Sequence, residues 1–226
     1  MGDVLDFFIR FWPKLLQGAG TTLLLTVEGL AAGLLLGLLT ALARVYGGKF
    51  WRGLAVGYVE IFRGTPLLVQ LFLIYYGLPG IGITLSREWS AFLALGLNSG
   101  AYQAEYLRGS ILAIGSGQMM AGRAIGMSKW QVIWEIILPQ ALRLAIPAWA
   151  NEPVSLLKST AVVFLIAIPE LMAQGKDIAA RTYNPIGAYI TVAIIYLAIV
   201  YLLDAFLKWA EVRAKIPGFE AEGKKA

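Results

Sequence analysis

The chain contains no cysteine and no histidine. Without cysteine it forms no disulfide and offers no thiolate for catalysis or metal binding. Without histidine, Ser-His-Asp and Cys-His catalytic groups and the HExxH zinc site are all excluded. Charge is also scarce: only 15% of the 226 residues are Asp, Glu, Lys or Arg, whereas soluble domains carry about 25%. The sequence therefore shows no constellation typical of an enzyme.

Apolar residues are abundant instead. They make up 58% of the chain, and the mean hydropathy is +0.69. A helix of about 20 apolar residues crosses a bilayer, and the apolar stretches are long enough for several crossings. We therefore predict an all-α integral membrane protein, a single transmembrane domain over residues 1–226. Its five transmembrane helices are expected at about residues 23–45, 54–78, 89–111, 154–172 and 187–209.

The N-terminal segment differs from a secretory signal peptide. Asp3 and Asp6 stand where basic residues are expected, and Lys14 interrupts the apolar stretch. Large apolar residues recur at helical spacing over residues 7–15, with charged residues between them. This pattern predicts an N-terminal amphipathic helix lying in the membrane interface; the alternative is a frayed leader.

Basic residues are distributed unevenly between the two ends of the predicted spans. Most lie in the connectors at residues 44–52 and 108–143 or in the C-terminal tail, and few lie in the opposite connectors. Lys and Arg concentrate on the cytoplasmic side of membrane proteins. We therefore expect the N-terminus outside the cell and the C-terminus in the cytoplasm. The basic residues form no single stripe, so nucleic-acid binding is not indicated.

Small residues recur every four positions in the first predicted span, at Gly29, Gly33 and Gly37, followed by Ala41. Such a series lets a second helix approach closely. We expect this face to pack against another span and assign no chemistry to it.

The segment 115–135 is too polar to lie in lipid. Met120, Ala124 and Met127 fall at i, i+4 and i+7, so a short helix would present them as one apolar patch. Methionine suits a surface that repacks as a partner moves. The pattern fits either a helix that docks on a partner or one that rests on lipid headgroups.

Polar residues also interrupt the fourth span. Glu152, Ser155 and Ser159 fall at i, i+3 and i+7, with Asn151 and Lys158 flanking them. Intramembrane polar groups usually face protein or a water-filled cavity. This stripe is therefore predicted to line a cavity and hold a cationic side chain; the alternative is a buried ion pair of Glu152 with Lys or Arg.

A second polar stripe, Asn98, Tyr102 and Glu105, shares one face of the third span. It fits either a cavity lining or hydrogen bonds between helices. Two acid–base pairs at i, i+3 spacing predict ion pairs at the cytoplasmic rim: Glu60 with Arg63, and Glu105 with Arg108.

Several motifs resemble the permease subunits of ABC importers. Gly126, followed after nine residues by 136–139 (Ile-x-Leu-Pro), resembles their cytoplasmic signature. Residues 62–70 and 101–109 resemble the second-span and third-span motifs of the polar amino-acid uptake branch. The segment 151–161 is most similar to subunits serving histidine, lysine, arginine, ornithine and opines.

The resemblance implies the type I ABC importer permease fold, with the segment 115–135 as a cytoplasmic coupling helix. The residues expected to contact the ATPase are Met120, Arg123, Ala124, Gly126 and Met127. The implied partners are a dimer of ATPase subunits, a second permease subunit and a solute-binding protein, periplasmic or tethered. The chain would lie in the bacterial inner membrane and would bind no cofactor, since ATP and Mg²⁺ belong to the ATPase.

The resemblance also implies a polar, cationic amino acid as substrate: arginine, lysine, ornithine, histidine or an opine. Its expected binding residues are Glu152, Asn151, Ser155, Ser159, Tyr102 and Asn98. The alternatives are an ABC permease for glutamine or glutamate and, from another class, an ATP-independent secondary transporter.

The coupling signature departs from the family in one respect. It normally begins Glu-Ala-Ala, and this chain reads Met120-Ala121-Gly122. We infer a heterodimer with a sister subunit that keeps the full signature; a homodimer is the alternative.

Overall fold

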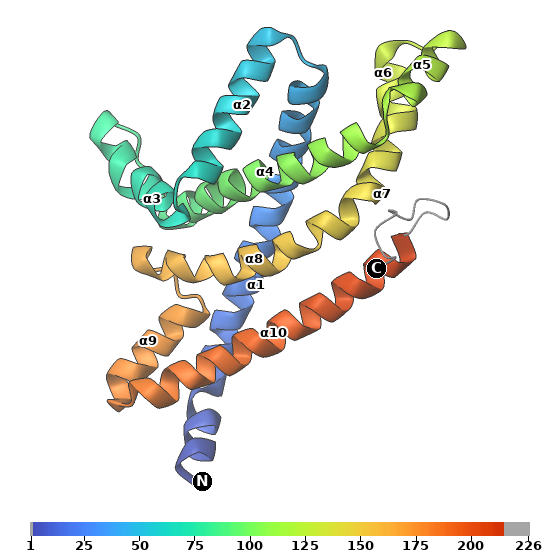
Figure 1. Cartoon of the computed structure of the whole chain (residues 1–226). Coiled ribbons are helices and arrows are strands. Elements are labelled where there is room, and N and C mark those ends of the chain that lie inside the picture. The colour runs from blue at the N-terminus through green and yellow to red at the C-terminus, as the bar shows by residue number, and fades with distance from the viewer. Residues whose placement is uncertain (1, 215–226) are drawn as a thin grey trace.

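The computed structural model describes the backbone of residues 2–214 and the side chains of residues 11–213. This part of the chain is almost entirely helical, which confirms the predicted all-α class (Figure 1). Helix α1 (Gly2–Tyr46) is continuous, so the predicted N-terminal helix is the first part of the same helix as the first span. The side chains of its residues before 11 lie outside the described ones.

Among the described residues, three helices are long and apolar enough to cross a bilayer, namely α1 from Phe11, the helical stretch Lys129–Trp149, and α10 (Pro185–Ala214). Two bent helix pairs raise the number to five. One joins α2 (Lys49–Gly64) to Leu67–Ile81, which includes α3 (Leu67–Phe72), at an angle of 107°. The other joins Asn151–Ile166 to α9 (Leu171–Thr182) at 52°.

Helix α4 (Arg87–Ala113) covers the residues of the third predicted span, and its 27 residues reach about 40 Å, but it is not among the helices named above as apolar enough to cross a bilayer. It packs against the glycine face of α1. A Cβ added at Gly33 would lie 2.6 Å from Nε2 of Gln103 and 3.0 Å from the amide nitrogen of Gly100. The close approach predicted from the glycine spacing is therefore present, between α1 and α4.

The fourth span predicted at 154–172 differs from the structure. The chain is helical, with short irregularities, from Lys129 to Ile166 and then turns at Ala167, whose φ is 61°. The successive elements are α6 (Lys129–Gln131), a π-helical turn (Val132–Ile137), α7 (Leu138–Trp149), α8 (Asn151–Ser159) and a 3₁₀ stretch (Thr160–Ile166). The departures from regular α-helix lie beside prolines: the wider π turn precedes Pro139 and a break at Ala150 precedes Pro153, whereas α7 continues through Pro147.

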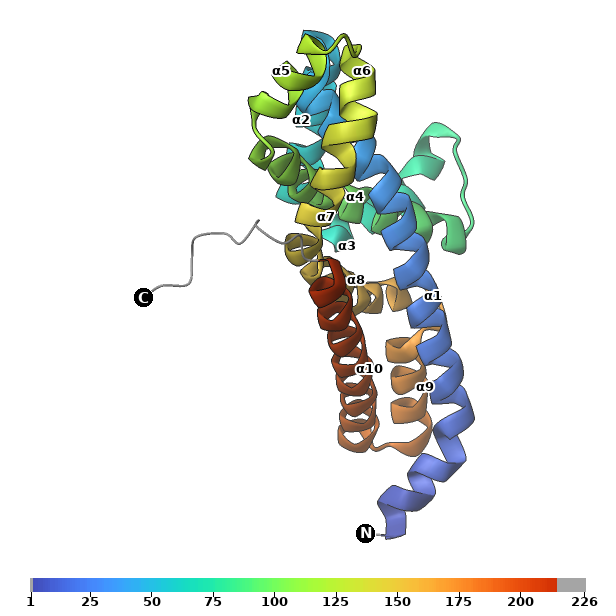
Figure 2. The same ribbon diagram turned by 90° about the vertical axis from the view of Figure 1, so that its right-hand side faces the viewer.

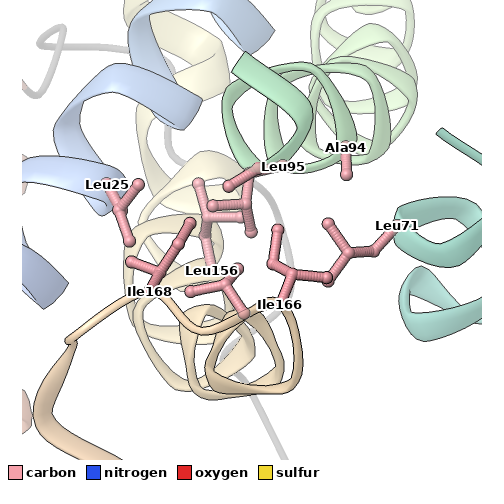
Figure 3. Close-up of a cluster of buried hydrophobic side chains, with 9 residues drawn as sticks. Leu25, Leu71, Ala94, Leu95, Leu156, Ile166 and Ile168 are labelled. Carbon is pink, nitrogen blue, oxygen red and sulfur yellow. The ribbon is translucent and has the colours of Figure 1, made fainter. Parts of the chain in front are cut away.

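The buried side chains form separate apolar clusters along the molecule. One cluster joins α1, α3, α4 and α8, with Leu156 near its centre (Figure 3). A second joins α1, α9 and α10, and α9 and α10 lie side by side (Figure 2). A third joins the ends of α1 and α4 to the helical stretch 132–145. These clusters hold the polar interior of the bundle in place.

Candidate functional site

A cavity of about 440 Å³ lies between the bend after α2, the middle of α4, and α8. Its lining residues are Arg63, Gly64, Thr65, Pro66, Leu67, Asn98, Tyr102, Tyr106, Glu152, Ser155, Leu156 and Ser159. All of the predicted substrate-binding residues except Asn151 are among them. Small-molecule sites typically measure about 300–1,000 Å³, so an amino acid fits this cavity.

One wall of the cavity is the bend between α2 and α3. The residue before a proline is driven out of the helical conformation, and Thr65 is extended, with φ −118° and ψ 145°. Pro66 is the N-cap of α3, which begins at Leu67. The second predicted span is therefore two helices at a wide angle, and residues 64–67 at their junction line the cavity.

The side chain of Gln70 holds this bend in shape. Its Nε2 donates to the carbonyl oxygens of Phe62 at 2.9 Å and Thr65 at 3.0 Å, and to Oγ1 of Thr65 at 2.9 Å. Nδ2 of Asn98 donates to the same Phe62 carbonyl and to Oε1 of Gln70, both at 3.1 Å. Asn98 thus connects α4 to the bend. Gln70 was given no individual role in the sequence analysis.

The carboxylate of Glu152 is buried on the opposite wall, with 4% of the residue exposed. Its Oε1 accepts a hydrogen bond from Oγ of Ser99 at 2.7 Å. Ser99 accepts from Nε2 of Gln103 at 3.0 Å, and Oε1 of Gln103 accepts from the indole of Trp149 at 2.8 Å. This network joins α4 to α7 and α8. Ser99 and Gln103 were not identified in the sequence analysis. Their i, i+4 spacing would have placed both polar side chains on one face of the third predicted span.

The predicted alternative for Glu152, an ion pair with Lys or Arg, is absent from the part of the chain that the structure describes. Lys158, although on the same helix, does not pair with it. Lys158 and Asn151 instead line a second cavity of about 370 Å³, between α8 and α10. Asn151 therefore does not line the first cavity, because its side of α8 faces α10, whereas Ser155 lines both cavities.

Glu105 lies among three arginines at the rim of the first cavity. It pairs with Arg44 and with Arg108, whose Nη2 lies 2.8 Å from Oε2. Nη1 of Arg63 lies 4.0 Å from the same Oε2. The predicted Glu105–Arg108 pair is therefore confirmed. The predicted Glu60–Arg63 pair is wrong, because α4 offers Arg63 a nearer carboxylate.

The segment 115–135 forms a helical hairpin at one end of the molecule (Figure 1). Helix α5 (Ser116–Ala124) ends at a loop in which Gly126 has φ 90°, a conformation that favours glycine. Nη1 of Arg123 donates to the Met127 carbonyl at 2.9 Å and closes this loop. Ser128 then caps α6, with Gln131 completing a reciprocal capping box.

The apolar patch on this hairpin differs from the predicted one. Met120 and Ala124 are exposed, as predicted, but Ile125 completes the exposed surface in place of Met127. Met127 is partly buried and packs against the cluster that joins α1, α4 and residues 132–145. The turn at Gly126 ends the helix before Met127, so the i, i+7 relationship to Met120 does not apply.

Three comparisons identify the relatives of this chain. Residues 33–216 match the family of binding-protein-dependent transport system inner membrane components. The glutamine transport system permease protein GlnP of Escherichia coli (strain K12) is 38% identical over 90% of this chain and 94% of its own length. The nopaline transport system permease protein NocM of Agrobacterium fabrum (strain C58) is 38% identical over 95% of both chains.

A solved structure agrees with these sequence relatives. The chain superposes on a crystal structure of an amino acid ABC transporter with histidines at a TM-score of 0.83 and 36% identity. The match covers 91% of this chain and 96% of the other. The predicted type I ABC importer permease fold is therefore confirmed, with ATP hydrolysis assigned to a separate subunit. The chain is a multi-pass inner-membrane permease subunit for amino acids that belongs to the family of binding-protein-dependent transport system inner membrane components.

Proposed function

We propose that this permease moves a polar amino acid with a cationic side chain, and that the 440 Å³ cavity receives it. The observation that carries the proposal is Glu152, a buried carboxylate in the cavity lining with no cationic partner among the described residues. Burying an unpaired charge costs free energy, which a cationic group recovers by pairing with it. A cationic substrate therefore supplies the positive charge that the described part of the protein does not place beside Glu152. Ser155 and Ser159 add hydroxyl groups on the same wall.

The relatives support an amino-acid substrate but differ in the one they name. NocM is named for nopaline and the solved transporter contains histidines, whereas GlnP is named for glutamine. A permease for glutamine or glutamate is thus the alternative within the same family. Family membership sets aside the ATP-independent secondary transporter.

The test is ATP-driven uptake by the complete transporter in proteoliposomes, measured with arginine, histidine, glutamine and glutamate. Glu152→Gln keeps the shape of the side chain and removes its charge. We expect arginine uptake to fall by the equivalent of about 2–5 kcal/mol, which is thirtyfold or more. Glu60→Gln, at an exposed carboxylate outside the cavity, is the matched control. Uptake of glutamine or glutamate but not of arginine by the wild-type transporter would overturn the proposal in favour of the alternative, and unchanged arginine uptake in Glu152→Gln would overturn the role of Glu152.

We also propose that the hairpin 115–135 is the surface that docks on the ATPase, where ATP and Mg²⁺ bind. Met120 is 64% exposed and Ile125 79% exposed, which supports an apolar contact. Arg123 and Gly126 shape the loop, and Met127 anchors it to the membrane domain. Replacing Ile125 by Asp is expected to lower copurification of the ATPase, whereas the same change at Ile83, exposed in the connector before α4, is not.

We propose a heterodimer of permease subunits with the N-terminus outside and the C-terminus in the cytoplasm. The methionine at position 120, in place of the family's glutamate, supports a sister subunit that keeps the carboxylate. Native mass measurement of the purified complex tests this, and two identical copies of this chain would overturn it. Because the chain has no cysteine, single cysteines introduced near each end report sidedness by labelling with an impermeant maleimide.

A further inference from the structure

Arg63 stands at the rim of the cavity, near the end of α2, with its side chain 42% exposed. Its guanidinium lies over the ring of Tyr102, 5.2 Å from the ring centroid. Both residues are part of the cavity lining. This contact with an aromatic face orients the guanidinium without using its hydrogen-bond donors.

The nearest carboxylate does not satisfy Arg63. Oε1 of Glu105 is taken by Arg44, and Oε2 accepts from Nη2 of Arg108 at 2.8 Å. Arg63 approaches the same Oε2 only to 4.0 Å, which is beyond hydrogen-bond distance. One carboxylate thus faces three guanidiniums, and Arg63 is the one of the three that lines the cavity.

The cavity therefore has two charged residues in its lining, Arg63 and Glu152, and they come from different walls. A free amino acid has the matching pair of charges, an α-carboxylate and at least one ammonium or guanidinium group. Arginine binds a carboxylate through two parallel N–H···O bonds, which makes it the side chain best suited to this ligand. Gln70 and Asn98 both donate to the carbonyl of Phe62, so the backbone beside Arg63 is fixed by hydrogen bonds.

We propose that Arg63 binds the α-carboxylate of the transported amino acid and makes the cavity select for an intact carboxylate. The inference rests on the proposed function, in which Glu152 binds the positive end. The substrate class becomes free amino acids, and the α-amides and decarboxylated amines of the same side chains are rejected. A purely structural Arg63, joining α2 to α4, would affect all of these ligands alike.

The test measures direct binding to the purified complex of permease and ATPase subunits in nanodiscs, without the solute-binding protein. This removes the selectivity of the binding protein from the measurement. The probes are radiolabelled arginine, histidine and glutamine, each compared with its α-amide. The variants are Arg63→Gln, Arg63→Lys and the control Arg52→Gln, an exposed arginine of α2 outside the cavity.

We expect the wild-type complex to prefer the amino acid to its α-amide about ten- to a hundredfold, the range for a hydrogen bond between charged groups. Arg63→Gln should remove this preference by weakening binding of the amino acid while leaving the amide unchanged. Arg63→Lys should retain part of it, and Arg52→Gln all of it. An undiminished preference in Arg63→Gln would overturn the inference, as would equal weakening of both ligands.

The Glu152→Gln variant separates this inference from the proposed function. If Arg63→Gln removes the preference but Glu152→Gln leaves the binding of arginine unchanged, the role of Glu152 is wrong and that of Arg63 stands. If only Glu152→Gln weakens binding, the proposed function stands and the present inference fails. A wild-type complex that binds none of the probes overturns both.

Discussion

Gly122 offers a sharp test of how the coupling hairpin is built. The family signature has alanine at this position, yet a Cβ here would lie 2.5 Å from Cγ2 and 3.2 Å from Cγ1 of Val132. Val132 is fully buried and β-branched, so its side chain has little freedom to move away. Overpacking of this kind costs about 1–3 kcal/mol. Replacing glycine by alanine within a helix stabilises the helix by up to about 1 kcal/mol.

Gly117 in the same helix separates these two effects, because nothing lies within 4 Å of a Cβ added there. Gly117→Ala should give only the helix-propensity gain, so Gly122→Ala should be less stable than this control by about 1–3 kcal/mol. Local stability is read from amide hydrogen exchange over residues 116–131 in the purified complex. ATP-driven uptake reports the functional consequence.

Shortening the side chain of Val132 gives the decisive comparison. In the double variant Gly122→Ala/Val132→Ala the added methyl occupies space that Val132 has vacated. The two changes should therefore destabilise the hairpin less together than the sum of their separate effects, since they share one contact. Equal exchange rates in Gly122→Ala and Gly117→Ala would refute the steric reasoning.

Three further substitutions test the bundle around the cavity. Gly33→Ala should force α1 and α4 apart and cost about 1–3 kcal/mol, measured as a lower melting temperature of the complex, whereas Gly20→Ala, with open space around it, should not. Gln70→Leu removes four hydrogen bonds, three to the bend after α2 and one from Asn98; uptake should fall with no loss of assembled complex, and normal uptake would contradict the assigned role. Glu105→Gln leaves three guanidiniums without a counter-charge and should destabilise the complex by about 3–5 kcal/mol, while Glu60→Gln changes little.

Much of the fold follows from local pattern. The glycine series in the first span predicts a close helix contact, and the structure contains it between α1 and α4. The Thr65–Pro66 break is also visible in sequence, because proline restricts the residue before it. The same reasoning fails for residues 139–153, where proline does not end the helix. There the helix continues through a π turn and a one-residue break, since packing against α1 and α4 outweighs the missing amides.

The sequence by itself determined the membrane class, the polar stripe of Glu152, Ser155 and Ser159, and the hairpin signature around Gly126. These depend on spacing within one helix or on the backbone preference of one residue, and both are local properties. Only the tertiary structure decided the partners across helices: Glu105 for Arg63, Ser99 for Glu152, and α10 for Asn151. The physical reason is that a spacing of three or four residues shows which side chains share a face. How each helix is rotated against its neighbours is decided by packing over the whole bundle.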